Sequence, residues 1–189
     1  MSDLVLATRN PHKVREFQRL LAPHRVLALP DDVDLPPEVG LSFEENAMPK
    51  ARAAAFATRS VSIADDSGIE AEALGGAPGV YSARFAGPDA TDAENLAKLL
   101  TEAPPGSRLE YVCVIAYVDP KTGAERCFEG RCKGRRAEEP RGTGGFGYDP
   151  AFIPDDGDGT RTMAELSDAE KDAISHRGRA ARELLDWLA

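Results

Sequence analysis

The N-terminal segment of the chain alternates between strand-like and helical patterns, and this alternation constrains the fold most. Asp3 to Thr8 is a short apolar run typical of a strand, and Asn10-Pro11 ends it. From His12 to Leu21 the apolar residues recur at helical spacing, and Arg25 to Leu29 is strand-like again. Strands that alternate with helices in this way predict an α/β fold with a mixed sheet.

The rest of the chain extends this pattern. Ser42, Thr91 and Ser167 each open a capping-box sequence, which predicts the start of a helix. Pro49 lies inside the first of these helices, so we expect either a bend there or a later start. The expected elements after the second strand are a helix from Ser42 to about Arg59, a strand from Val61 to Asp65 with extended chain from Ile69 to Leu74, a helix from Thr91 to about Ala103, a hairpin of Leu109 to Val118 and Glu125 to Lys133, and a last helix from Ser167.

Composition excludes several functional classes. A length of 189 residues fits one domain, residues 1–189, or two small lobes that share one core, better than two independent domains. The net charge of −9 argues against binding of nucleic acid. No apolar run approaches the roughly 20 residues of a membrane helix, and the N-terminus lacks the features of a secretory signal. The 3 cysteines form no close pair, so we expect reduced thiols and a cytoplasmic protein.

The first group of candidate site residues lies where the first strand meets the first helix. Free backbone N–H groups and the helix dipole favour an anion at such a helix start, and Lys13 adds a charge that can reach a phosphate. The alternative is an ordinary strand–helix junction with Asn10 as a turn residue. The members of this group are Thr8, Arg9, Asn10, Pro11, His12 and Lys13.

The second group is Ala64-Asp65-Asp66-Ser67-Gly68, in which two carboxylates directly follow an apolar strand. Adjacent acids repel unless a cation neutralises them, and carboxylates with waters suit Mg²⁺. Successive strand residues point to opposite faces, so only one of the two acids can enter a site fully. Glu38, in an acidic loop, offers a third carboxylate. The alternative is a solvated Asp-Ser-Gly turn.

Two further groups offer contacts for a ring-bearing ligand. The glycines of Gly144-Gly145-Phe146-Gly147-Tyr148-Asp149 permit close approach of the backbone, and the two aromatic residues offer stacking surface. Lys171, Ser175, His176 and Arg177 lie along one predicted helix, and the three basic residues can donate hydrogen bonds to an acceptor such as a 6-oxo group. The alternatives are a loop anchored by its aromatic residues and a solvated, charged helix face.

Together the four groups supply a phosphate cradle, an acidic pair, an aromatic lid and a cluster of donors, which are the parts needed to hydrolyse a nucleoside triphosphate. From Leu4 to about Leu188 the chain also resembles the inosine triphosphate pyrophosphatases, a family also described as dITP/XTP or non-standard purine NTP pyrophosphatases. The motifs that carry the resemblance are A-T-R-N-x-x-K (7–13), S-F-x-E-N-A-x-x-K-A (42–51), A-D-D-S-G (64–68), L-G-G-A-P-G-V-Y-S-A-R (74–84), G-T-G-G-F-G-Y-D-P (142–150) and S-H-R (175–177).

The resemblance implies an elongated, two-lobed α/β fold, with a central mixed β-sheet flanked by helices and an active-site cleft between the lobes. It implies a homodimer that requires Mg²⁺. The implied reaction is hydrolysis of ITP, dITP and XTP to the monophosphate and pyrophosphate, which clears deaminated purines from the nucleotide pool and keeps them out of DNA and RNA.

The resemblance also implies a role for each matching residue. Asp66 would activate water and, with Glu38, would bind the metal, while the residues from Thr8 to Lys13 would bind the triphosphate. Because a nearby cation lowers the pKa of a carboxyl group, we expect Asp66 to be a weak base that mainly positions water. The remaining roles would be substrate contact by Ser67, binding of the nucleoside by Phe146, Gly147, Tyr148 and Asp149, and reading of the base by Lys171, His176 and Arg177.

Two positions depart from the family pattern. Arg9 stands where the family often has glycine; arginine adds charge near a phosphate but gives up the backbone freedom that favours contact through its N–H. Pro49 interrupts the motif that contains Asn46 and Lys50, and for this reason neither residue is placed in the expected site.

Two alternatives remain open at this point. A Maf-type pyrophosphatase would act on dTTP or UTP, but Ser175-His176-Arg177 and the glycine-rich loop match the purine enzymes. A non-catalytic purine nucleotide sensor would bind ITP without releasing pyrophosphate, but the carboxylates and Lys13 needed for catalysis are present. Substrate profiling separates these hypotheses.

Overall fold

The computed structural model describes residues 2–189 of the chain. Short 3-10 helices add to the regular elements at Glu72–Leu74, Gly79–Arg84, Asp149–Ala151 and Met163–Glu165. The helices and strands are, in chain order, β1 (Asp3–Leu6), α1 (Pro11–Leu20), β2 (Arg25–Ala28), α2 (Phe43–Thr58), β3 (Ser62–Ala71), α3 (Asp92–Glu102), β4 (Arg108–Asp119), β5 (Ala124–Arg136), β6 (Phe152–Pro154), α4 (Asp168–Ile174) and α5 (His176–Leu188).

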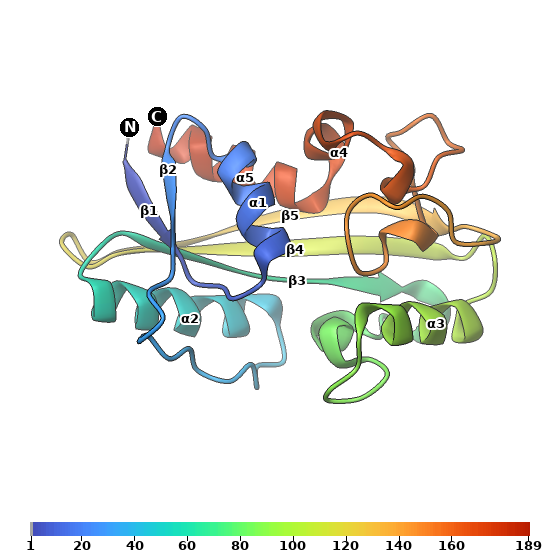
Figure 1. Cartoon of the computed structure of the whole chain (residues 1–189), viewed down its shortest axis with the longest axis horizontal. Coiled ribbons are helices and arrows are strands. Elements are labelled where there is room, and N and C mark those ends of the chain that lie inside the picture. Colours follow the sequence, from blue (N-terminus) through green and yellow to red (C-terminus); the bar gives the residue numbers. More distant parts are fainter. Residues whose placement is uncertain (1) are drawn as a thin grey trace. The chain divides into compact units, whose positions relative to one another are not determined.

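The strands form a mixed sheet of 6 strands in the order β2-β1-β3-β4-β5-β6 (Figure 1). Strand β1 runs parallel to β2 and to β3, whereas β6 runs antiparallel to β5. The predicted α/β class with a mixed sheet is therefore confirmed. Among residues 2–189, no helix combines the length and apolar character needed to span a membrane.

The chain divides into two compact units, and several elements contribute residues to both. Unit 1 runs to Asp66 and adds Cys113–Gly130 and Arg179–Ala189. Unit 2 comprises Ser67–Val112 and Arg131–Gly178. Strand β3 thus changes unit between Asp66 and Ser67, two residues that the sequence places in one motif.

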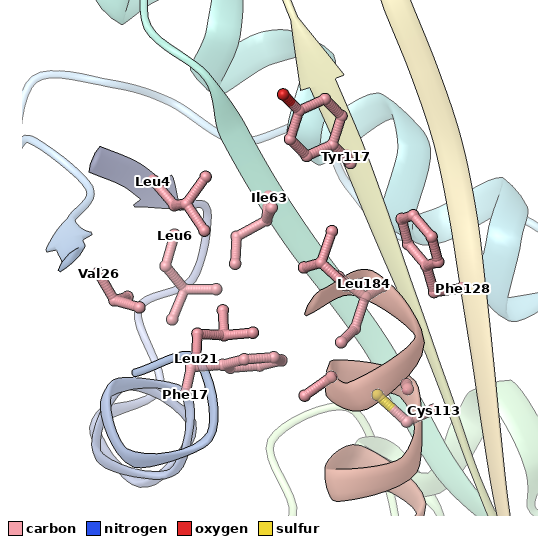
Figure 2. Close-up of a cluster of buried hydrophobic side chains, with 13 residues drawn as sticks. Leu4, Leu6, Phe17, Leu21, Val26, Ile63, Cys113, Tyr117, Phe128 and Leu184 are labelled. Atoms are coloured by element: carbon pink, nitrogen blue, oxygen red, sulfur yellow. The ribbon is translucent and has the colours of Figure 1, made fainter. Parts of the chain in front are cut away.

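Unit 1 has a core built from strands and helices together. Leu6 of β1, Phe17 of α1, Ile63 of β3 and Leu184 of α5 are fully buried and converge in one cluster (Figure 2). Within this unit, α1 and α5 lie over one face of the sheet and α2 lies over the other (Figure 1). Successive side chains of β3 in this unit therefore point toward different helices.

Unit 2 has its own core. Ile69 of β3, Leu99 of α3, Tyr111 of β4 and Phe152 of β6 are buried together. Tyr148 also belongs to this cluster, so the glycine-rich loop that contains it is anchored to the core of the unit.

The predicted helix starts are largely confirmed. Thr91 and Ser167 cap α3 and α4 as full capping boxes, and the Ser42 Oγ accepts a hydrogen bond from the Glu45 N–H at 3.2 Å at the start of α2. Helix α2 begins directly after Ser42 and continues past Pro49 to Thr58. Of the two expectations for Pro49, a bend or a later start, the later start is therefore wrong. The helix buries Ala47, Ala51, Ala54 and Ala55, and this burial offsets the backbone donor that proline removes.

Strand β3 is longer than the sequence predicts. It runs without a break through Asp65, Asp66, Ser67 and Gly68 to Ala71, so the predicted strand end at Asp65 and the alternative of a solvated turn are both wrong. The strand lies between β1 and β4 in the sheet. Backbone groups on both of its edges can therefore join the sheet, which outweighs the low strand propensity of these four residues.

The predicted last helix is in fact two helices. Ser175 between them is extended, with φ −66° and ψ 156°, and its Oγ accepts a hydrogen bond from the Gly178 N–H at 3.0 Å. A Cβ at Gly178 would lie 2.0 Å from the carbonyl oxygen of Asp172, so only glycine allows α4 and α5 to approach this closely. Lys171 and His176 therefore belong to different helices, contrary to the prediction.

Candidate active site

Unit 1 gathers acids and amines around strand β3. The two aspartates come from β3, Lys13 from the first turn of α1, and Asn46 and Lys50 from α2. We call this group the acid–amine cluster, and its members are Lys13, Glu38, Asn46, Lys50, Asp65 and Asp66.

Asp65 forms a buried ion pair with Lys13. The Asp65 side chain has 0% of its surface exposed, and its Oδ2 lies 3.0 Å from the Lys13 Nζ. The thiol of Cys113 also approaches this oxygen, at 4.0 Å. Asp65 therefore holds Lys13 over strand β3, on the side of the strand that faces α1.

Asp66 contacts helix α2. The Asn46 Nδ2 donates a hydrogen bond of 2.9 Å to the Asp66 Oδ2. Burial, followed by the charge of Glu38, raises the pKa of Asp66 to about 6, and the opposing effects of Lys50, Asn46 and Lys13 are smaller. The residues of the protein thus make Asp66 a stronger base than an ordinary aspartate, so the low pKa expected from the sequence depends on a bound cation alone.

Lys50 links two acidic segments of the cluster. Its Nζ forms an ion pair with the Glu38 carboxylate and donates a hydrogen bond of 2.7 Å to the backbone oxygen of Asp65. Burial alone would lower the pKa of Lys50, but the charges of Asp65 and Glu38 outweigh burial, so the pKa is raised. The amine therefore stays charged and keeps the Glu38 loop next to β3.

The start of α1 differs from the predicted anion site. The N–H groups of His12 and Lys13 donate to the Asn10 Oδ1 at 2.9 and 3.4 Å, and the Val14 N–H donates to the Asn10 carbonyl oxygen at 3.1 Å. Pro11 has no N–H to offer. The prediction of free backbone N–H groups at this helix start is therefore wrong, because Asn10 satisfies them. The charge of Lys13 and the helix dipole are the features that remain to attract a phosphate.

The other side chains of this junction make local contacts. The Thr8 Oγ1 accepts a hydrogen bond from the Asn10 N–H at 3.2 Å, and the His12 Nδ1 lies 2.7 Å from an Arg15 guanidinium nitrogen. The Arg9 guanidinium is engaged by the loop that follows β2, so the structure brings Lys13 but not this guanidinium to the acids. The carbonyl oxygens that accept from Arg9 at 2.8 to 2.9 Å are those of Leu29, Pro30 and Val33.

Glu38 and Asp66 are candidate ligands for a divalent cation. Their charges act on each other, since Glu38 is one cause of the raised pKa of Asp66. Mg²⁺ in nucleotide enzymes is commonly held by one or two carboxylates together with phosphate oxygens and waters, and this pair fits that donor set. Within residues 2–189, no group of three His, Cys, Asp or Glu side chains could hold a metal by itself. The cluster therefore suits a cation that is shared with a phosphate ligand, not a closed structural metal site.

Unit 2 gathers aromatic and cationic side chains. Lys171, His176 and Arg177 are at most 4% exposed, so the alternative of a solvated, charged helix face is wrong. The Arg177 Nη2 donates a hydrogen bond of 2.9 Å to the Ser67 Oγ. We call this group the aromatic–basic cluster, and its members are Ser67, Tyr111, Phe146, Asp149, Lys171, His176 and Arg177.

Asp149 accepts three hydrogen bonds from side chains and backbone of this cluster. Its Oδ2 accepts from the Lys171 Nζ at 2.7 Å and from the Phe146 N–H at 3.0 Å, and its Oδ1 accepts from the Tyr111 hydroxyl at 3.1 Å. A Cβ at Gly145, where φ is +68°, would lie 2.0 Å from the Asp149 Oδ2, so the loop can close around this carboxylate only with glycine there. Asp149 thus orients Lys171 and the loop backbone.

Phe146 presents the ring that suits a stacked ligand. The side chain is half-buried, and the Lys171 Nζ and the Arg177 guanidinium carbon lie 5.3 and 5.6 Å from its ring centroid. Both distances are within the range of cation–π attraction. A planar ligand with oxygen acceptors on its edge would meet both the ring and these cations.

Two residues of the glycine-rich loop have anchoring contacts instead. The Tyr148 hydroxyl donates a hydrogen bond of 2.6 Å to the carbonyl oxygen of Ser82, and its side chain is buried. The Gly147 N–H donates to the Asp92 Oδ2 at 3.1 Å. The loop is therefore anchored by one of its aromatic residues, as one alternative predicted, and the structure leaves Phe146 as its stacking candidate.

Sequence reasoning missed three members of the two clusters: Asn46, Lys50 and Tyr111. Asn46 and Lys50 are four residues apart, a spacing that puts both side chains on one helix face, and only Pro49 argued against them. Tyr111 stands in a long apolar strand segment, where nothing in the sequence distinguishes it from an ordinary core tyrosine.

The fold and the two clusters, one in each unit, define a class of protein: a mixed-sheet α/β protein whose unit 1 has side chains suited to a phosphate and a cation, and whose unit 2 has side chains suited to a ring with oxygen acceptors. Residues 4–187 match the Ham1 family, and the chain belongs to this family.

Relatives of known description cover the chain from end to end. The dITP/XTP pyrophosphatase of Mycolicibacterium paratuberculosis is 49% identical over 197 residues, which is 100% of this chain and 96% of the relative. The dITP/XTP pyrophosphatase of Escherichia coli K12 is 48% identical over 200 residues, 100% of this chain and 98% of the relative. The solved structure of a HAM1 protein from Coxiella burnetii matches with a TM-score of 0.86 and 41% identity, covering 100% of this chain and 98% of that chain. The resemblance found in the sequence is therefore confirmed.

Proposed function

We propose that this protein hydrolyses ITP, dITP and XTP to the corresponding monophosphate and pyrophosphate. The full-length relatives named dITP/XTP pyrophosphatase support this substrate class. The observation that carries the chemistry is Asp66, a buried carboxylate with a pKa of about 6 beside Glu38 and Lys50. The activity would clear deaminated purines from the nucleotide pool and so keep them out of DNA and RNA.

Asp66 is the proposed catalytic base. Without metal, a pKa of about 6 leaves it ionised at neutral pH and a stronger base than an ordinary aspartate. Mg²⁺ bound to the same carboxylate would lower that pKa, so Asp66 would act mainly by positioning the water. The hydrogen bond from Asn46 fixes the rotation of the carboxylate, and this orients the water for attack on the α-phosphorus.

The amines and the helix start are proposed to receive the triphosphate. Negative charge builds on the phosphorus oxygens and on the departing pyrophosphate, and Lys13 supplies a positive charge there. Thr8 and Asn10 shape the turn that presents Lys13, while Lys50 keeps Glu38 beside Asp66. Mg²⁺ is the proposed cofactor, held by Glu38 and Asp66, and when bound it would neutralise phosphate charge and lower the pKa of water.

The aromatic–basic cluster is proposed to select the base. Phe146 would stack on the purine, with the backbone of Gly147, Tyr148 and Asp149 completing the loop around it. Lys171, His176 and Arg177 would donate to the 6-oxo group. Ser67, whose Oγ accepts a hydrogen bond from Arg177, would also contact the substrate. The 6-amino group of adenine would leave these donors unpaired, so ATP should be a poor substrate.

Pyrophosphate release from ITP, dITP, XTP, GTP, ATP, dTTP and UTP, each with Mg²⁺ and with EDTA, tests this proposal. We expect release from the first three substrates and only in the presence of Mg²⁺. Strong release from dTTP or UTP would favour the Maf-type alternative. Tight ITP binding without release from any substrate would overturn the enzymatic function and leave the sensor.

We also propose that residues 1–189 form one catalytic domain and that the protein is a cytoplasmic homodimer which binds neither nucleic acid nor membrane. The family resemblance supports the dimer, and the net charge of −9 supports the exclusion of nucleic acid. No disulfide joins Cys113, Cys127 or Cys132, in keeping with a reducing compartment. Sedimentation velocity tests the dimer, since a monomer at micromolar concentration would contradict it.

A further inference from the structure

Tyr111 connects two members of the aromatic–basic cluster, although it lies outside every motif of the sequence. It stands on strand β4 with 6% of its surface exposed. Its hydroxyl donates to the Asp149 Oδ1 at 3.1 Å. Its ring lies parallel to the imidazole of His176, with an interplanar angle of 6° and a centroid distance of 4.5 Å.

We propose that Tyr111 is a positioning residue for base specificity, holding Asp149 through its hydroxyl and His176 through its ring. The proposal rests on the proposed function, because it concerns how the base-selecting side chains of that site are kept in place.

The hydroxyl fixes the carboxylate that orients Lys171. With Lys171 and the Phe146 N–H on Oδ2 and Tyr111 on Oδ1, both oxygens of Asp149 are held and the carboxylate cannot rotate without breaking a hydrogen bond. Burial, followed by the charge of Asp149, raises the pKa of Tyr111 well above its usual value. The hydroxyl therefore stays protonated and remains a donor at neutral pH.

The ring fixes the plane of His176. The imidazole stacks on one face of Tyr111, and the Tyr111 ring packs in turn against Phe152, with centroids 4.6 Å apart and planes tilted by 46°. Phe152 is fully buried in the core of unit 2, so the stack has a rigid support. Because the ring nitrogens of histidine lie in the ring plane, a fixed plane also fixes the directions of their hydrogen bonds.

Fixed directions matter because the site discriminates between bases by hydrogen bonds. Donors held in place favour a base with an acceptor at the right position and penalise one that leaves them unpaired. If a donor can turn away, a base that does not match it is penalised less. Tyr111 should therefore act on substrate affinity and on the ratio between bases, more than on the chemical step.

Two variants separate the two contacts. Tyr111→Phe removes the hydroxyl and keeps the stack, whereas Tyr111→Leu removes both. Tyr117→Phe is the matched control, since Tyr117 is a buried tyrosine on the same strand whose ring packs at 4.9 Å against Trp187 in unit 1. We measure KM and kcat for ITP, XTP and ATP, together with the melting temperature.

For Tyr111→Phe we expect the KM for ITP and XTP to rise about 3- to 10-fold, in line with the net contribution of one ordinary hydrogen bond, with kcat changed less than about twofold. The preference for ITP over ATP should fall by a similar factor, and Tyr111→Leu should lower it further. Tyr117→Phe should match wild type. A double-mutant cycle with Asp149→Asn should show that the effects of Tyr111→Phe and Asp149→Asn are not additive.

Wild-type kinetics for Tyr111→Phe, or a fall in kcat with KM and base preference unchanged, would overturn the proposal. Additive effects in the double-mutant cycle would also overturn it, because Tyr111 would then not act through Asp149. A wild-type protein that hydrolyses none of the three nucleotides would instead overturn the proposed function, so the two failures can be told apart.

Discussion

The Asn46 Nδ2 donates a hydrogen bond of 2.9 Å to the Asp66 Oδ2, so a residue of α2 holds the carboxylate that strand β3 supplies. This carboxylate is buried beside Glu38, and its pKa is raised to about 6. An acid whose pKa is raised by the folded state destabilises that state once it is ionised. The protein therefore keeps a charged Asp66 at some cost in stability.

The substitution Asp66→Asn should stabilise the protein at neutral pH. The pKa of Asp66 is about 6 in the folded state and 3.8 in its ordinary state, so the folded state binds more protons between these values. Stability contributed by this group is thus lost as the pH rises from about 4 to about 6. Asp66→Asn should raise the free energy of unfolding by about 1–3 kcal/mol at pH 8, and the difference should vanish near pH 4.

Urea unfolding in EDTA at several pH values measures this effect. Asp186→Asn, on the exposed side of α5, is the control and should change stability by less than about 0.5 kcal/mol. A wild type that is as stable as Asp66→Asn at pH 8 would show that the ionised Asp66 carboxylate does not destabilise the folded state.

Lys50 should contribute far more to stability than Arg52, although both lie on α2 and pair with a glutamate. The Lys50 side chain is 8% exposed in its pair with Glu38, whereas the Arg52 side chain is 57% exposed in its pair with Glu125. Lys50→Met removes the positive charge beside Glu38 and the Asp65 carbonyl. It should lower the free energy of unfolding by about 2–4 kcal/mol. Arg52→Met should cost less than about 1 kcal/mol. Equal losses in chemical denaturation would contradict the assigned linking role of Lys50.

Lys13 and Arg9 should differ sharply in their effect on catalysis. The Lys13 Nζ is held beside Asp65, where it can receive a phosphate, whereas the Arg9 guanidinium is bound to loop carbonyls. Lys13→Ala should lower kcat/KM for ITP about 10²- to 10³-fold, the usual effect of removing a group that stabilises transition-state charge. Arg9→Ala should lower it less than about tenfold, since it removes no such group. A larger loss in Arg9→Ala than in Lys13→Ala would reverse this assignment.

Phe146 should provide stacking energy for the base. Its ring is half-buried beside Lys171 and Arg177, whereas Phe56 on α2 is 87% exposed. Phe146→Ala should raise the KM for ITP about 10-fold, as expected for loss of one stacked base contact. Phe56→Ala serves as the control and should leave KM unchanged. An unchanged KM in Phe146→Ala would remove this ring from the binding site.

Much of the fold could be predicted because local signals agreed with the tertiary structure. The helix starts at Ser42, Thr91 and Ser167 follow from capping chemistry that acts within one turn. The continuous β3 could not be predicted, because Asp65 to Gly68 favour a turn locally and only the neighbouring strands make them extended. The break at Ser175 depends on close contact between two helices, which periodicity does not reveal.

The candidate site also combines residues that the sequence predicts with contacts that depend on the tertiary structure. Lys13, Asp66, Asp149 and Lys171 were identified from residue type and position, and the structure places each in one of the two clusters. The structure gives Asn10 a capping contact and Tyr148 an anchoring contact, which the sequence does not reveal, because a residue that caps a helix or anchors a loop has the same sequence signal as one that binds a ligand. Tyr111 gave no signal, since its contacts come from segments distant in sequence.

The most direct test of the central claim is product analysis of ITP hydrolysis with Mg²⁺ for the wild type and for Asp66→Asn. The account predicts one IMP and one pyrophosphate per ITP for the wild type, and loss of nearly all activity in a folded Asp66→Asn protein. Formation of IDP and inorganic phosphate, or full activity without the Asp66 carboxylate, would contradict it.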